Sequence, residues 1–157
     1  MPERLKASVG AIMSRDVPTL ARDASVADAV RLLLERDASC AVVVEDGDLP
    51  SGIITERDLL PMAMNQRGGL PGLVLRQILQ DERHILDFLQ QARKAHASLV
   101  ADVMSSPVKC ADIDMTVGQV AAIMEAFDYR QLPVVREGRL VGLVTRHDIV
   151  RAIADKT

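Results

Sequence analysis

Apolar and polar positions alternate with helical periodicity in two separate parts of the chain. In the first part, the apolar residues at positions i, i+3, i+4 and i+7 are Val26, Ala29, Val30 and Leu33. This spacing places them on one face of an amphipathic helix. Ser25 precedes the pattern and Asp28 lies three residues further on, which is typical of a capping box at a helix start.

The second part repeats this arrangement almost position by position. Its apolar residues at the same spacing are Val117, Val120, Ala121 and Met124. Thr116 takes the place of Ser25, and Gln119 takes the place of Asp28. The sequence therefore predicts two helices of the same kind, each with a capped start.

Short runs of β-branched and aliphatic residues flank each predicted helix. Residues 17–20 and 108–111 precede the helices and indicate a short first strand in each copy. After the helices come two further apolar runs, residues 40–44 and 132–135, each followed by a turn and another apolar run. The turns are Asp46-Gly47 and Glu137-Gly138. They predict hairpins, because glycine readily adopts the positive φ that such turns need.

These elements come in the same order twice: strand, helix, strand, strand, helix. Aligning Met13-Ser14 with Met104-Ser105 superimposes the two copies. One extra residue after Leu49 then brings GIITERD (52–58) onto GLVTRHD (142–148). A unit of about 50 residues buries too little surface to be stable alone. We therefore predict an α/β fold in which two β-α-β-β-α repeats pack about a pseudo-twofold axis.

The segment between the copies departs from this duplication. Residues 68–72, GGLPG, cannot continue a helix. Residues 73–96 have apolar positions at helical spacing, namely Leu75, Ile78, Leu79, Ile85, Leu86, Leu89 and Ala92. They predict an amphipathic helix that covers either the module's own core or a partner chain. We assign residues 1–65 to repeat 1, 66–99 to the loop and linker helix, and 100–157 to repeat 2.

The pattern Thr-x-x-Asp occurs at the same place in both copies, as Thr55 with Asp58 and as Thr145 with Asp148. Two interpretations are open. The side chains can satisfy backbone amides at a helix start. Alternatively they can hold a ligand, because a carboxylate accepts both hydroxyls of a ribose and a helix start favours a phosphate. In the first copy Pro61 would fall inside the helix, which argues against capping as the only role there.

Gly52 and Gly142 open the two segments that contain this pattern. Glycine in a strand often marks a close approach of the backbone to another group. We expect these two glycines to let the backbone approach the ligand.

Composition and charge narrow the classes of function. The chain is 48% hydrophobic and 26% charged, with a net charge of −3, which is ordinary for a soluble globular protein. Its aromatic residues are Phe88, Phe127 and Tyr129. It therefore lacks the basic surface and the stacking rings that nucleic-acid binding needs.

No apolar run reaches the roughly 18 residues that span a bilayer, and MPERLKASVG does not resemble a secretion signal. We expect a cytoplasmic protein without membrane or nucleic-acid partners.

Metal sites and catalytic sets are not indicated. Cys40 and Cys110 lie in apolar surroundings without Cys-x-x-Cys spacing, so we expect two reduced thiols. His84, His96 and His147 show no i, i+4 pair. The sequence has no Ser/His/Asp set and no phosphate-binding glycine loop of the Walker type. We expect a protein that is not an enzyme.

The duplicated unit resembles the CBS domain, and the pair resembles a Bateman module, the tandem arrangement that serves as a regulatory insert in many enzymes and channels. The resemblance covers roughly residues 9–62 and 100–154. It is carried by Met13-Ser14, Met104-Ser105, the run Tyr129-Arg130-Gln131-Leu132-Pro133-Val134-Val135, the two turns, GIITERD and GLVTRHD.

The resemblance implies binding of AMP, ADP, ATP or S-adenosylmethionine in clefts between the two repeats. In the family the acid of the motif receives the ribose hydroxyls, and the Ser or Thr lies close to the sugar and phosphate. The adenine lies against the first strand and pairs with the backbone of the second. Carried over, one cleft comprises Val108, Lys109, Arg130, Gln131, Leu132, Pro133, Thr145, Arg146, His147 and Asp148. The other comprises Val17, Pro18, Cys40, Ala41, Val42, Thr55, Arg57 and Asp58.

The two clefts differ in charge. The second copy has Lys109, Arg130, Arg146 and His147 where the first has Pro18, Ser39, Glu56 and Arg57. A polyphosphate needs cations, and Val42 stands where the second copy has Pro133. We therefore expect a stronger site at Thr145 and Asp148, and a weaker or empty one at Thr55 and Asp58. Arg130 can serve either cleft or be a solvated surface arginine.

We thus expect a non-enzymatic regulatory module with no obligatory cofactor. It binds an adenosine ligand and signals that the site is occupied through a conformational or oligomeric change. Such a module has no domain of its own to regulate and must act through an oligomer or another chain, so we expect a homodimer, with an unidentified regulated protein as a further partner. The alternatives are an architectural dimerisation module without ligand, and a detached regulatory subunit of an enzyme or transporter.

Overall fold

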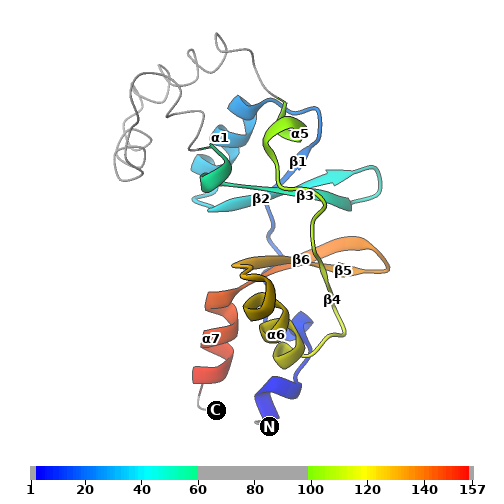
Figure 1. The fold of residues 1–157 in the computed structure, drawn as a ribbon, viewed down its shortest axis with the longest axis vertical. Helices are drawn as coiled ribbons and strands as arrows, with labels where there is room; N and C mark the ends of the chain where they lie inside the picture. The colour runs from blue at the N-terminus through cyan, green and yellow to red at the C-terminus, as the bar shows by residue number, and fades with distance from the viewer. Residues whose placement is uncertain (1–2, 60–98, 156–157) are drawn as a thin grey trace. The chain divides into compact units, whose positions relative to one another are not determined.

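The computed structural model describes residues 3–59 and 99–155, which form two compact units (Figure 1). The second-repeat unit comprises residues 3–17, 46–50 and 108–155, and the first-repeat unit comprises residues 18–45, 51–59 and 99–107. The elements of the second-repeat unit are η1 (Glu3–Lys6), η2 (Val9–Ala11), β4 (Ala111–Asp112), α6 (Val117–Phe127), β5 (Gln131–Arg136), β6 (Arg139–Thr145) and α7 (Arg146–Ala154). The elements of the first-repeat unit are β1 (Thr19–Ala21), α1 (Val26–Glu35), β2 (Cys40–Glu45), β3 (Leu49–Thr55, of which the first two residues belong to the other unit) and α5 (Val100–Val103).

Each unit contains a mixed three-stranded sheet, in the orders β1-β2-β3 and β4-β5-β6. β1 is parallel to β2, β4 is parallel to β5, and β5 is antiparallel to β6. In Figure 1, α6 and α7 lie on one face of the second sheet. The predicted α/β class and the strand-helix-strand-strand order of both copies are confirmed. The predicted loop 68–72 and helix 73–96, together with Pro61, lie outside the described residues.

The two capped helices form as the sequence predicts. Ser25 Oγ accepts the Asp28 amide at 3.0 Å, and the Asp28 carboxylate accepts the Ser25 amide at 3.3 Å. Thr116 and Gln119 make the same reciprocal pair at 3.1 and 2.9 Å. The helix faces buried in the two cores are Val26, Ala29, Val30 and Leu33 on α1, and Val117, Val120 and Met124 on α6. Burial of these faces and the satisfied first-turn amides explain why both helices begin where they do.

The first strand of each sheet is displaced from its predicted position. β4 covers Ala111–Asp112 instead of residues 108–111. In the first sheet, the Val42 amide donates to the Pro18 carbonyl at 2.9 Å, just ahead of β1. Pro133 stands at the position of Val42 and has no N–H to donate. The proline therefore prevents the corresponding bond, and β4 begins only at Ala111.

The hairpin turns explain the extra residue of the first copy. Between β5 and β6 only Glu137 and Gly138 form the turn, with φ of 52° and 80°. Positive φ at both central residues is the geometry that fits the twist of a two-residue hairpin. Between β2 and β3 the turn covers residues 46–48, with Gly47 at 78° and Asp48 at 60°. The extra residue therefore lies in the turn, and not after Leu49 as the alignment suggested.

Each unit takes its Met-Ser segment from the other sequence repeat. Ser14 and Leu143 exchange two backbone hydrogen bonds of 2.9 Å in the second-repeat unit. Ser105 and Ile53 exchange two of 2.9 and 3.1 Å in the first-repeat unit. A structural unit therefore contains residues from both sequence repeats.

No helix among residues 3–59 and 99–155 has the length and apolar character needed to cross a membrane.

Candidate functional site

Thr145 and Asp148 form a closed hydrogen-bonded pair at the start of α7. The Thr145 amide and hydroxyl donate to Asp148 Oδ2 at 2.9 and 3.0 Å, and the Asp148 amide donates back to Thr145 Oγ1 at 3.2 Å. Thr145 is the N-cap of α7. The capping interpretation of the motif is therefore realised in the second copy, whatever further role these side chains have.

The second carboxylate oxygen of Asp148, Oδ1, is bound by Arg151. The Asp148 side chain is 13% exposed, and Oδ1 accepts a hydrogen bond of 3.2 Å from Arg151 Nη2. The Arg151 side chain is 66% exposed. An ion pair with so exposed a partner is weak.

The first copy repeats the pair at the end of β3. The Thr55 amide and hydroxyl donate to Asp58 Oδ2 at 2.8 and 3.2 Å. Residues 56–59 are helical, and the Glu56 amide donates to the Ser39 carbonyl at 3.2 Å. Both copies of the motif are thus folded in the same way, and capping alone does not distinguish them.

The strand register brings the expected adenine edge of the second copy next to Thr145. Gln131 pairs directly with Thr145 across β5 and β6, and Leu132 and Pro133 pair with Val144 and Leu143. Parallel pairing of β4 with β5 brings the chain through Val108 and Lys109 to the end of the sheet where β5 begins. The structure therefore gathers most of the residues expected in this cleft at one edge of the sheet.

In the first copy the corresponding strand residues offer mainly backbone groups. Cys40, Ala41 and Val42 are buried in β2, and the Val42 amide donates to the carbonyl of Pro18, the residue that follows Val17.

Burial raises the pKa of the Cys40 thiol to about 11, because a buried thiolate loses its hydration. Burial also raises the pKa of Cys110. Both cysteines are free thiols.

All four cations expected around the second motif are exposed, and three of them form no ion pair with a described residue. Lys109, Arg130 and His147 are exposed and form no ion pair with a residue of the described ranges 3–59 and 99–155. Arg57 of the first copy is exposed in the same way. These side chains would not have to break an ion pair with a described residue to face an anionic ligand.

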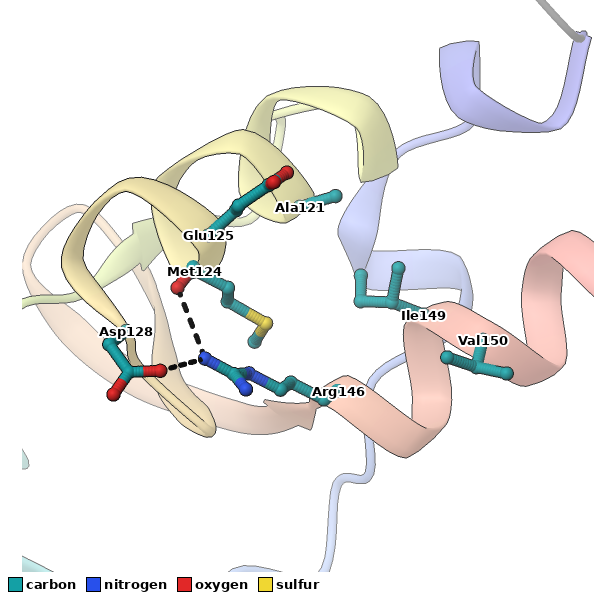
Figure 2. Close-up of a pocket in the computed structure, with 7 residues that line it drawn as sticks. All are labelled: Ala121, Met124, Glu125, Asp128, Arg146, Ile149 and Val150. Atoms are coloured by element: carbon teal, nitrogen blue, oxygen red, sulfur yellow. Dashed lines mark hydrogen bonds and ion pairs between the residues drawn. The ribbon is translucent and has the colours of Figure 1, made fainter.

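Arg146 is the exception, because its guanidinium is bound at the end of α6 (Figure 2). Its Nε donates to the Tyr129 carbonyl at 2.7 Å. Its Nη2 donates to Asp128 Oδ1 at 2.8 Å and to the Met124 carbonyl at 3.4 Å. Sequence spacing gave no signal for these contacts, since nothing in the local pattern pairs Arg146 with a residue of the preceding helix.

The glycines of the motif do not serve the purpose expected of them. A Cβ on Gly142 would lie 2.9 Å from Met13 Cγ and 2.9 Å from the Ser14 carbonyl oxygen. A Cβ on Gly52 would lie 2.9 Å from Met104 Cγ. The expectation that they admit a ligand is therefore corrected: these glycines make room for the two Met-Ser segments.

A pocket of about 360 Å³ lies between α6 and α7, where the sequence gave no indication of one. Figure 2 shows its lining residues, which are Ala121, Met124, Glu125, Asp128, Arg146, Ile149 and Val150. Of the residues expected to bind ligand, it includes Arg146 but neither Thr145 nor Asp148. Among the described residues no group of three or more His, Cys, Asp or Glu side chains is arranged to hold a metal ion.

The family model of the CBS domain matches this chain twice, at residues 9–64 and 100–155. Two uncharacterized proteins, from Methanocaldococcus jannaschii and Methanopyrus kandleri, are each 28% identical to it over 92% of its length. The chain covers 31% of the first of these proteins and 61% of the second. It therefore spans only part of the length of these relatives.

Solved structures of similar fold cover nearly the whole chain. The CBS domain of a CBS domain containing membrane protein from Sphaerobacter thermophilus is 26% identical, with a TM-score of 0.71 over 94% of this chain and 88% of its own. CBSX2 of Arabidopsis thaliana, solved in complex with AMP, is 24% identical with a TM-score of 0.68, over 93% and 95%. The CBS domain pair of protein MJ0100, solved with 5-methylthioadenosine and S-adenosyl-L-methionine, is 22% identical with a TM-score of 0.66, over 94% and 95%.

Proposed function

The chain belongs to the CBS domain family, as a tandem pair, and from this premise we propose that it is a non-enzymatic regulatory module that binds an adenosine-type ligand. The ligand class includes AMP, ADP, ATP and S-adenosylmethionine. Two structural neighbours supply the chemical precedent, since one was solved with AMP and the other with S-adenosyl-L-methionine and 5-methylthioadenosine. No obligatory cofactor is part of the proposal.

The observation that carries the proposal is the pairing of Gln131 with Thr145. It sets the start of β5 beside the Thr145 and Asp148 pair at the edge of one sheet. Backbone groups for a base, a carboxylate for a ribose diol and a helix start for a phosphate then lie on neighbouring residues of one sheet edge. We propose that Asp148 Oδ1 receives the ribose and that Thr145 lies close to the sugar and phosphate.

Charge favours the second motif over the first. Arg130, Lys109 and His147 are solvent-exposed there, without ion pairs to other described residues. The first motif offers Arg57, but the residue that precedes it is the acid Glu56. A phosphate gains charge-assisted hydrogen bonds from the second set. We propose the stronger site at Thr145 and Asp148, and a weaker or empty one at Thr55 and Asp58.

Signalling through a homodimer is part of the same proposal. Three large apolar side chains on α6 and α7 are exposed. They are Phe127 on α6 at 62%, and Val150 and Ile153 on α7 at 62% and 51%. Exposed apolar groups on neighbouring helices favour a protein partner. We propose that a second copy of the chain covers them, and that ligand binding alters this pairing. The cytoplasmic location expected from the sequence remains part of the proposal.

The competing function is an architectural dimer that binds no ligand. The closed Thr145 and Asp148 pair favours it, because capping accounts for both side chains without a ligand. Thermal melting with AMP, ADP, ATP or S-adenosylmethionine separates the two functions. A ligand at a hundredfold its Kd stabilises the fold by about 2.7 kcal/mol, which raises Tm by roughly 5 to 10 °C for a chain of this size. If none of the four compounds raises Tm, the architectural function replaces the proposed one.

A further inference from the structure

Arg146 binds two consecutive backbone carbonyls of the chain that leads into β5. Its side-chain Nε donates to the Tyr129 carbonyl at 2.7 Å. Its backbone amide donates to the Arg130 carbonyl at 2.9 Å. One residue therefore fixes the peptide groups on both sides of the Arg130 Cα, and with them the direction in which the Arg130 side chain leaves the backbone.

The remaining bonds of Arg146 hold it in this position. Its Nη2 donates to Asp128 Oδ1 at 2.8 Å and to the Met124 carbonyl at 3.4 Å (Figure 2). Asp128 is the C-cap of α6 and has φ of 55° and ψ of 37°. A cation at a helix C-terminus is favoured by the helix dipole and by the unpaired carbonyls of the last turn. The Arg146 side chain is 45% exposed, but its Nε and Nη2 are already bound to Tyr129, Asp128 and Met124 of its own chain.

The first copy contains only half of this arrangement. Glu56 occupies the position of Arg146, and its amide donates to the Ser39 carbonyl at 3.2 Å, as the Arg146 amide does to Arg130. A carboxylate has no N–H with which to bind the preceding carbonyl of Ala38. The side-chain half of the anchor is therefore specific to the second copy, which is also the copy with an arginine in place of Ser39.

We propose that Arg146 is a positioning residue: it orients Arg130 toward an anionic group of the ligand and does not touch the ligand itself. This inference rests on the proposed function, since it assigns the phosphate-contacting role at the Thr145 and Asp148 site to Arg130. The Arg130 side chain is exposed and forms no ion pair with any residue of the described ranges. It is therefore available to a phosphate in a way that the Arg146 guanidinium is not.

A double-mutant cycle on the full chain tests the inference, with AMP and adenosine as probes that differ only in the phosphate. Arg146→Gln removes the side-chain anchor and keeps the backbone amide, and Arg130→Gln removes the proposed phosphate contact. Each single variant is expected to raise the Kd for AMP about tenfold. Each is expected to change the Kd for adenosine less than about twofold, because the ribose and base contacts remain.

The cycle also separates an indirect effect from a direct one. If Arg146 acts through Arg130, adding Arg146→Gln to Arg130→Gln leaves the AMP affinity unchanged. Additive losses would mean that Arg146 meets the phosphate directly, and would overturn the inference. Equal losses of AMP and adenosine affinity in Arg146→Gln would also overturn it, since they would indicate a purely structural role.

Two further variants keep the test decisive. Arg146→Lys retains a cation at the end of α6 but lacks the planar fork that binds several acceptors together. It replaces Arg146→Gln in the test if that variant does not fold. It is expected to show the same selective loss of affinity for AMP. Glu56→Gln, at the matching position of the first copy, is expected to leave both affinities unchanged. A wild-type protein that binds neither probe would overturn the proposed function together with this inference, whereas binding with a non-selective Arg146→Gln loss overturns this inference alone.

Discussion

The carboxylate of Asp148 accepts two hydrogen bonds from Thr145, one from the backbone amide at 2.9 Å and one from the hydroxyl at 3.0 Å. The Asp148 amide returns a bond to the same hydroxyl at 3.2 Å. The residues proposed to hold a ribose therefore already stabilise the start of α7. Any test of binding has to be separated from this contribution to folding.

Thr145→Ala is expected to lower the free energy of unfolding by about 1 kcal/mol, because it removes an N-cap hydroxyl. Thr145→Ser keeps the hydroxyl and is expected to stay within about 0.5 kcal/mol of the wild type. Urea unfolding of the three proteins without ligand measures both effects. An unchanged midpoint for Thr145→Ala would mean that the cap contributes nothing.

Gly142→Ala is expected to destabilise the fold by about 2 to 3 kcal/mol, near the upper end of overpacking effects. Its Cβ would lie 2.9 Å from the Ser14 carbonyl oxygen, a backbone atom that cannot rotate away, as well as 2.9 Å from Met13 Cγ. Gly52→Ala is the matched control, because the nearest atoms there all belong to the flexible side chain of Met104. We expect it to cost about 1 kcal/mol less. Chemical unfolding of both variants decides the point, and equal losses would contradict the packing assigned to Ser14.

The Cys40 thiol is expected to make stability fall at alkaline pH. Its pKa in the folded protein is raised to about 11 by burial, against 9.0 for an unperturbed thiol. As pH rises, the unfolded chain therefore releases this proton first. The stabilisation is complete below pH 9 and is lost as pH approaches 11.

Comparing the wild type with Cys40→Ala between pH 7 and about 10.5 isolates this effect, because the other titrating groups are common to both proteins. The free energy of unfolding of the wild type should fall more steeply with pH than that of Cys40→Ala. Parallel curves would show that Cys40 keeps an ordinary pKa in the folded protein.

Val150→Glu is expected to weaken the proposed homodimer at least tenfold, because it places a charge among exposed apolar side chains of α7. Val150 is 62% exposed, so the free energy of unfolding of the single chain should change by less than about 0.5 kcal/mol. Ala21→Glu introduces the same charge at an exposed position of β1 in the first-repeat unit and is the matched control. Sedimentation equilibrium measures both, and a monomeric wild type at micromolar concentration, or an undisturbed Val150→Glu dimer, would contradict the proposal.

Local signals in the sequence predicted the elements well. Ser25 and Thr116 begin their helices as expected, because a capping box and the apolar spacing behind it act within a few residues. The hairpin at Glu137 and Gly138 was predictable for the same reason, since positive φ is a property of the turn itself. The displaced start of β4 depends on the missing N–H of Pro133 in another strand, so local strand propensity could not indicate it.

Contacts between distant residues were not predictable from one sequence. Met13 fills the space at Gly142, and Arg146 reaches back to Asp128. Neither pair leaves a periodic pattern, because each depends on how whole elements pack. The motif glycines and Arg146 were accordingly assigned to the ligand, whereas the structure shows the glycines in packing contacts and the arginine bound to α6. The family resemblance placed Gln131 and Thr145 in one cleft, and the structure pairs these two residues across β5 and β6; their binding of a ligand remains a prediction.

Calorimetric titration of AMP into the wild type, Asp148→Asn and Asp58→Asn tests the central claim most directly. Asparagine keeps an oxygen that can accept the Thr145 amide, so the helix start is retained while the charge that favours a ribose diol is lost. We expect saturable binding to the wild type, a loss of affinity of at least about tenfold in Asp148→Asn, and little change in Asp58→Asn. Unaltered AMP affinity in Asp148→Asn, or no heat of binding to the wild type, would contradict the account.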